Sequence, residues 1–172
     1  RLSGATSKFG VQYDSLADLV SLGIAPALLA FSWALRPYGK FGWLAAFLFV
    51  VCGALRLARF NVQSSSGEVK YFKGLPIPAA ASMIALTILL YLRLIETNWV
   101  KDIVILVMIY ILAFLMVSNI RYFSFKELDL AKRKPFSIFI FVILSMIVIV
   151  MEPTIVLFGF ILSYVFSGPV NM

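Results

Sequence analysis

Residues 14–35 read DSLADLVSLGIAPALLAFSWAL, an apolar run that is headed by two aspartates. A helix needs about 20 apolar residues to cross a hydrocarbon core of about 30 Å, so this stretch alone predicts a membrane-spanning helix. Asp14 and Asp18 then lie near one membrane face, and Asp14 caps the free amides of the first turn. Pro26 removes a backbone donor inside the run and predicts a kink in the helix.

The rest of the chain repeats this pattern of apolar runs. Of the 172 residues, 62% are hydrophobic and 13% are charged, which is far too apolar for an ordinary soluble domain. We therefore predict an all-α fold, a polytopic membrane helical bundle of about six transmembrane helices that forms a single domain over residues 1–172. The other predicted spans are 41–58, 77–94, 102–120, 136–151 and 153–167.

Two polar connections lie between these runs. The segment at about 60–74 contains three consecutive serines and a glycine, which predict a flexible loop and a candidate lid. The segment at 121–135, RYFSFKELDLAKRKP, predicts an amphipathic, basic stretch at the membrane interface.

The basic residues divide unevenly between the two sides of the predicted bundle. The chain has 15 Lys and Arg and a net charge of +7. Because loops rich in Lys and Arg stay in the cytoplasm, we expect a multi-pass integral membrane protein with both aspartates on the cytoplasmic side of the cell membrane. Charge placed between apolar runs also argues against nucleic-acid binding. The side of the N-terminus receives eleven basic residues: Arg1, Lys8, Arg56, Arg59, Lys70, Lys73, Arg121, Lys126, Lys132, Arg133 and Lys134; the other side receives Arg36, Lys40, Arg93 and Lys101.

Asp14 and Asp18 are one helical turn apart, so their carboxylates project from nearly the same face and repel each other. A divalent cation between them would remove this repulsion, and their hard oxygens suit Mg²⁺, Mn²⁺ or Ca²⁺. Gly10 lies four residues before Asp14, where the missing side chain lets a bulky ligand approach the backbone. Two alternatives remain open at this point: acids that favour the start of a helix dipole, or a small transporter whose acids bind a permeating cation.

Arg1, Gly10, Asp14 and Asp18 are separated by eight, three and three residues. This pattern resembles the second half of the CDP-alcohol phosphotransferase signature, D-x-x-D-G-x-x-A-R, eight residues, then G-x-x-x-D-x-x-x-D. Within that family, RLARFN at 56–61 and GLPIPAAA at 74–81 are similar to membrane-type phosphatidylserine synthases of bacteria and archaea. The first two aspartates of the signature would precede Arg1, so we expect a family domain that lacks its N-terminal helices.

The resemblance implies an activity: transfer of a phosphatidyl group from CDP-diacylglycerol to the hydroxyl of L-serine, with release of CMP. It implies that Asp14 and Asp18 bind Mg²⁺ or Mn²⁺, with two ions in a complete site, and that Asp18 is also the catalytic base. It further implies that Arg1, Ser7 and Gly10 contact the CDP-lipid and that the protein is a homodimer in membrane lipid. Glycerol phosphate or inositol phosphate remains an alternative acceptor, and ester and ether lipid tails are equally compatible.

Arg56, Arg59 and Asn61 lie at the cytoplasmic end of the second predicted span. Arginines at such a position are often anchors that reach the lipid headgroups. The spacing of three residues between Arg56 and Arg59 places both on one helix face, and their position in the RLARFN segment favours a second interpretation. In this interpretation the three residues bind the carboxylate of serine or the phosphates.

Overall fold

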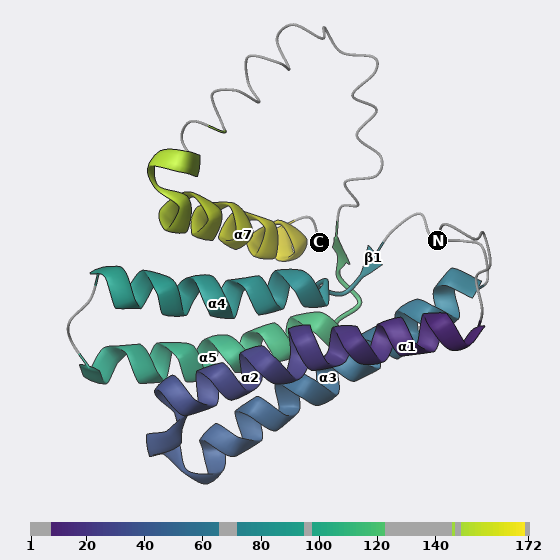
Figure 1. Cartoon of the computed structure of the whole chain (residues 1–172), viewed down its shortest axis with the longest axis horizontal. Helices are drawn as coiled ribbons and strands as arrows, with labels where there is room; N and C mark the ends of the chain where they lie inside the picture. Colours follow the sequence, from purple (N-terminus) through teal and green to yellow (C-terminus); the bar gives the residue numbers. More distant parts are fainter. Residues whose placement is uncertain (1–7, 66–71, 95–97, 123–145, 147–148, 171–172) are drawn as a thin grey trace, which may run out of the picture.

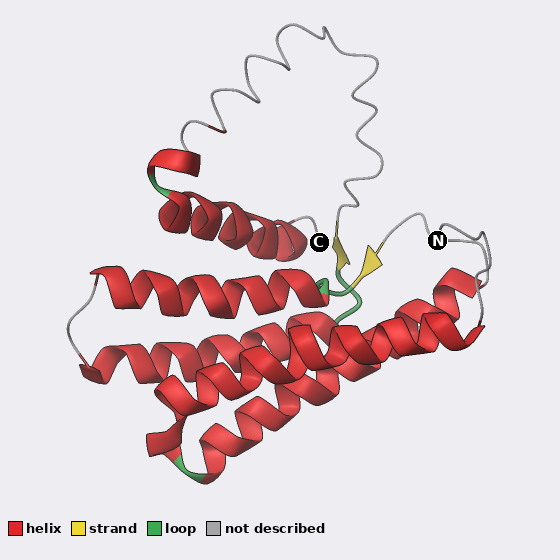
Figure 2. Cartoon of the chain, in the orientation of Figure 1, coloured by secondary structure: helices red, strands yellow, loops and turns green. Residues whose placement is uncertain are grey.

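The computed structural model describes residues 8–65, 72–94, 98–122, 146 and 149–170 (Figure 1). These residues form a bundle of helices joined near one end by a short pair of strands (Figure 2). The helical membrane fold expected from the sequence is therefore confirmed. Two helical stretches, Phe9–Tyr38 and Lys40–Val62, are long and apolar enough to cross a membrane. The predicted number of spans stays a prediction.

The first helical stretch begins earlier than the sequence predicts. It runs through α1 (Lys8–Asp18), the π-helical turn η1 (Leu19–Ile24), α2 (Ala25–Ala30), a second π-helical turn η2 (Phe31–Leu35) and the 3₁₀ turn η3 (Arg36–Tyr38). The predicted start at residue 14 is wrong, because no helix-breaking residue separates KFGVQY from the apolar run. Asp14 consequently lies inside a helix instead of capping one. Pro26 occupies the first turn of α2, directly after η1, where its missing amide is tolerated.

Helix α3 (Lys40–Ser65) follows a turn at Gly39, whose φ of 51° suits glycine. The helix extends about two turns beyond the end of the predicted span 41–58. The predicted loop at 60–74 is therefore wrong over its first residues. Polar residues such as those of this segment can continue a helix, because their backbone groups form the same helical hydrogen bonds. Residues 66–71, the middle of the candidate lid, lie outside the described residues.

A two-stranded antiparallel sheet joins two distant connections of the chain. Strand β1 (Phe72–Lys73) pairs with β2 (Arg121–Tyr122). Gly74 then turns the chain with a φ of 85°, and its amide donates to the Ile120 carbonyl at 2.8 Å. The segment predicted as amphipathic at 121–135 therefore begins as a strand, because its backbone pairs with β1. Its remaining residues, 123–135, lie outside the described residues.

Three further helices complete the described bundle. Helix α4 (Ile77–Leu94) has the bounds that the sequence predicts, α5 (Asn98–Val117) begins and ends slightly earlier than the predicted span 102–120, and α7 (Pro153–Val170) extends past the predicted end at 167. Most of the predicted span 136–151 lies outside the described residues. Figure 1 shows α4 between α5 and α7, and α3 packs along α5.

The core is built around a close crossing of three helical segments. A Cβ atom at Gly53 of α3 would lie 2.8 Å from Cδ1 of Ile77, and one at Gly23 of η1 would lie 3.9 Å from the same atom. Ile77 is 1% exposed and inserts between these two glycines at the start of α4. Small residues allow helix backbones to approach closely in membrane proteins. This crossing fixes α1 and η1 against the half of α3 that carries Arg56.

Candidate functional site

Most of the candidate residues that the structure describes gather at one end of the bundle. Here α1 runs beside the C-terminal part of α3, close to the β1–β2 strands (Figure 1). The amide of Asn61 in α3 donates a hydrogen bond of 2.8 Å to the Ser15 hydroxyl in α1, which in turn donates to the Val11 carbonyl at 3.1 Å. Asn61 thus joins the helix that carries both aspartates to the helix that carries both arginines.

Asp14 and Asp18 project from adjacent turns of α1, as their spacing predicts. Asp14 is exposed, whereas Asp18 is partly buried and interacts electrostatically with Arg56. Gly10 lies one further turn back on the same exposed side of α1. Arg1 and Ser7, the other expected contacts of the CDP-lipid, lie outside the described residues.

Two carboxylates supply hard oxygen ligands that fit Mg²⁺ or Mn²⁺, but they are only part of an octahedral cage. Within the described residues, no group of three or more His, Cys, Asp or Glu side chains could hold a metal ion. Asp14 and Asp18 would therefore share an ion with further ligands from elsewhere in the protein, from substrate or from water. Such an ion would supply charge neutralisation at a bound phosphate.

Arg56 is a buried cation that interacts with one member of this carboxylate pair, Asp18. It is 9% exposed, and its guanidinium lies 5.8 Å from the centre of the Phe60 ring, within range of a cation–π contact. It also interacts electrostatically with Asp18 and with Tyr164 of α7. Among the described residues, no hydrogen bond or ion pair to its guanidinium is found. Burying a charge without such a partner raises the free energy of the folded protein. Binding of an anion would lower it by supplying hydrogen-bond acceptors to the guanidinium.

Arg59, one turn further along α3, differs from Arg56 because its guanidinium is hydrogen-bonded to other groups of the protein. Its Nη2 donates to the Asn119 side-chain oxygen at 2.8 Å, and its Nη1 lies 3.4 Å from the Val117 carbonyl at the end of α5. A cation at a helix C-terminus satisfies free carbonyls and favours the helix dipole. The structure therefore separates two arginines that the sequence places together: Arg59 joins α3 to α5, and Arg56 interacts with Asp18.

Tyr122 and Tyr164 are two site residues that the sequence analysis did not single out. Tyr122 of β2 is 1% exposed, and its hydroxyl donates to the Val165 carbonyl of α7 at 3.3 Å. Burial raises the pKa of Tyr122 to about 12. The Tyr122 and Tyr164 rings are 5.6 Å apart between centroids and tilted by 41°. A tyrosine near the end of an apolar helix usually indicates an interfacial residue, so the sequence offered no signal for this arrangement.

Comparison with known proteins gives the class of the chain. The profile of the CDP-alcohol phosphatidyltransferase family matches residues 1–111, which include both aspartates, Arg56 and Arg59. The chain belongs to this family, and the resemblance noted in the sequence is confirmed. Helix α7 and strand β2 lie beyond the matched residues.

Three individual relatives show which enzymes the chain is similar to. A CDP-diacylglycerol–serine O-phosphatidyltransferase of Helicobacter pylori (strain ATCC 700392 / 26695) is 38% identical over 170 residues, which cover 98% of this chain and 69% of the relative. The enzyme of the same name from Methanocaldococcus jannaschii is 37% identical over 71% of this chain and 53% of its own length. An archaetidylserine synthase of Methanothermobacter thermautotrophicus is 48% identical over 45% of this chain and 32% of its own length.

Proposed function

We propose that the protein is a CDP-diacylglycerol–serine O-phosphatidyltransferase, which transfers a phosphatidyl group to the hydroxyl of L-serine and releases CMP. The observation that carries the proposal is the position of Asp18 on α1 beside the buried Arg56 of α3. A proton acceptor and an anion-binding group thereby lie together at one end of the bundle. Family membership and the names of the relatives support the same activity.

In this reaction the Asp18 carboxylate accepts the proton of the serine hydroxyl. The serine oxygen then forms a bond to the phosphorus that carries diacylglycerol, and the bond from that phosphorus to the oxygen of CMP breaks. The contribution of Asp18 as a base depends on its placement within hydrogen-bonding reach of the serine hydroxyl. A Mg²⁺ or Mn²⁺ ion held by Asp14 and Asp18 would supply charge neutralisation at the phosphates. Gly10, with Arg1 and Ser7, would contact the CDP-lipid.

The proposal is tested by CMP release from CDP-diacylglycerol in detergent or liposomes, using the full-length protein with serine and with Mg²⁺ or Mn²⁺. We expect serine-dependent release that falls at least about 100-fold in Asp18→Asn, because a general base contributes that much to proton transfer. Glu152→Gln is the matched control, since Glu152 is an acid of similar exposure that is paired with Arg93. Undiminished activity in Asp18→Asn would refute its role as the base.

Separate experiments test the identity of the acceptor and the binding of the metal. Release that depends on glycerol phosphate or inositol phosphate instead of serine would assign the protein to the alternative acceptors. Asp14→Asn is expected to weaken Mn²⁺ binding as measured by electron paramagnetic resonance, because one of two carboxylate ligands is lost. Ion accumulation in liposomes that needs no CDP-lipid would instead favour a cation transporter.

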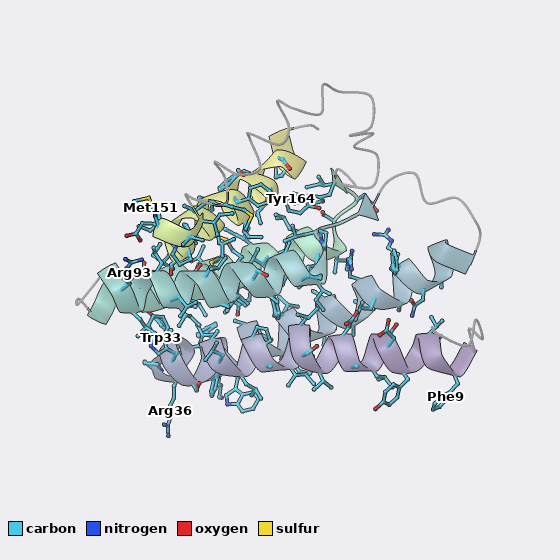
Figure 3. All side chains as sticks on the ribbon, turned by 45° about the horizontal axis from the view of Figure 1, so that its top comes forward. Phe9, Trp33, Arg36, Arg93, Met151 and Tyr164 are labelled. Atoms are coloured by element: carbon cyan, nitrogen blue, oxygen red, sulfur yellow. The ribbon has the colours of Figure 1, made fainter. Side chains whose placement is uncertain are left out.

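We further propose a multi-pass membrane protein with this site on the cytoplasmic side. Figure 3 shows Arg36 and Arg93 at the end of the molecule opposite Phe9, an arrangement that supports the uneven division of basic residues between the two sides. Labelling of single cysteines at positions 36 and 59 from either side of the membrane tests this orientation. A homodimer is the expected assembly, and cross-linking in the membrane tests it.

A further inference from the structure

The surroundings of Arg56 come from three helices. Phe60 of α3 lies against one side of the guanidinium, and Asp18 of α1 and Tyr164 of α7 both interact with it electrostatically. Tyr164 lies outside the residues that the family profile matches. A helix beyond the matched part of the chain therefore contributes a hydroxyl group to the candidate site.

Contacts with Tyr122 of β2 fix the position of Tyr164 on α7. Its ring packs on Tyr122, which is fully buried and donates to the backbone of Val165. Gly168 permits this contact, because a Cβ atom there would lie 2.3 Å from the Tyr122 ring. Since β2 is itself paired with β1, the sheet holds α7 at the rotation that brings Tyr164 toward Arg56. Figure 3 shows Tyr164 on α7 at the end near the strands.

We propose that Tyr164 determines acceptor specificity, its hydroxyl and the Arg56 guanidinium together binding the carboxylate of serine. This inference rests on the proposed function. A phenol donates one hydrogen bond and a guanidinium offers a planar fork of donors, so the pair matches the two oxygens of a carboxylate. The hydroxyl of serine is three bonds from its carboxyl carbon, and Asp18 lies on the α1 side of Arg56. A carboxylate bound at Arg56 and Tyr164 therefore directs the hydroxyl of serine toward Asp18.

The charge of this subsite favours a carboxylate over a phosphate. Arg59 is already bound to Asn119 and to the end of α5, whereas the Arg56 guanidinium interacts with Asp18 and Tyr164. One guanidinium with a neutral hydroxyl balances a singly charged carboxylate. An acceptor that carries a phosphate has nearly twice the charge and would call for additional cations.

The experiment measures steady-state CMP release by the full-length protein while serine and CDP-diacylglycerol are varied separately. Tyr164→Phe removes only the hydroxyl, and we expect the KM for serine to rise about tenfold, because a hydrogen bond to a charged group is lost. The KM for CDP-diacylglycerol should stay the same. Arg56→Lys should also raise the KM for serine, and the double variant should raise it by less than the product of the two single effects, because both groups bind one carboxylate.

A tyrosine away from the site provides the control. Tyr110→Phe removes a hydroxyl that donates to the Phe41 carbonyl at 3.2 Å, far from Arg56 in the chain and on a different helix from Tyr164. This variant should leave the KM for serine unchanged. An unchanged KM for serine in Tyr164→Phe, or an equal rise for CDP-diacylglycerol, overturns the inference. If the unmodified protein releases no CMP with serine, the proposed function fails instead.

Discussion

The two ends of the bundle use their charged side chains in opposite ways. At the end where α4 finishes and α7 begins, Arg93 and Glu152 form the ion pair of the described part of the chain, through two hydrogen bonds of 2.5 and 3.1 Å. At the other end, Arg56 interacts electrostatically with Asp18, yet no ion pair joins these two residues in the described part of the chain. Arg56 is also far more buried than Arg93.

From this difference we expect the Arg93–Glu152 pair to support the fold and Arg56 to bind a ligand. A paired, half-exposed arginine gives a modest contribution to stability. A buried arginine without a hydrogen-bonding partner lowers stability, and such a cost is tolerated where binding or catalysis needs the charge. Substitution of Arg56 should therefore reduce activity more than stability. Substitution in the Arg93–Glu152 pair should reduce stability more than activity.

Arg56→Met should have the largest effect. Methionine fills a similar volume without charge, so we expect kcat/KM for serine to fall about 100-fold while the free energy of unfolding stays the same or rises by about 1 kcal/mol. CMP release and thermal unfolding in detergent measure the two quantities. A variant that loses both activity and stability would show that Arg56 supports the fold, and the contrast between the two ends would disappear.

Arg59→Ala tests the arginine that is bound to protein at the site end. Its contacts with Asn119 and the Val117 carbonyl are lost, so the free energy of unfolding should fall by about 1 to 2 kcal/mol. The KM for serine should stay the same, because Arg59 binds groups of the protein and not substrate. Asn119→Ala is the matched variant, since it removes the other partner of the same hydrogen bond. A selective rise in the KM for serine would instead make Arg59 a substrate ligand.

Tyr122→Phe should change how stability depends on pH. The folded protein raises the pKa of Tyr122 from 10 to about 12, so above pH 10 the unfolded chain releases this proton first. Stability that is fully present below pH 10 is therefore lost as the pH rises toward 12. Unfolding temperatures measured across this range should fall less steeply in Tyr122→Phe. Equal slopes for both proteins would show that Tyr122 is not protected from ionisation.

Glu152→Gln should have the smallest effect. The Arg93 and Glu152 side chains are each 47% exposed, and exposed pairs contribute less than about 1 kcal/mol. We expect a small decrease in unfolding temperature, weaker still at high salt, and full CMP release. A large loss of activity would mean that this end of α7 also positions Tyr164.

The sequence predicted much of the fold because apolar runs of membrane length admit few alternatives. The bounds of α4 follow from Pro76 and from the apolar residues after it, and the structure has the same bounds. The start of α1 and the end of α3 were missed because polar residues continue a helix as easily as they end one. The β1–β2 pair was missed because two-residue strands depend on contacts between segments far apart in the chain.

The candidate site was predictable where one helix carries it. Asp14 and Asp18 share a face because spacing alone fixes their direction. Tyr164 was not predictable, since its approach to Arg56 depends on how α7 packs against β2. The different uses of Arg56 and Arg59 also depend on tertiary structure, because only the end of α5 distinguishes two arginines on the same face.

The insertion of Ile77 beside Gly53 makes these two positions interdependent. A methyl group at 53 would meet only the terminal carbon of Ile77 at short range, and the next carbon lies at an ordinary 3.7 Å. Valine at 77 lacks that terminal carbon, so alanine at 53 becomes acceptable together with valine at 77, although alanine alone crowds the crossing. Across homologous sequences, a larger residue at position 53 should therefore accompany a smaller residue at position 77, because the two side chains share one space at the crossing.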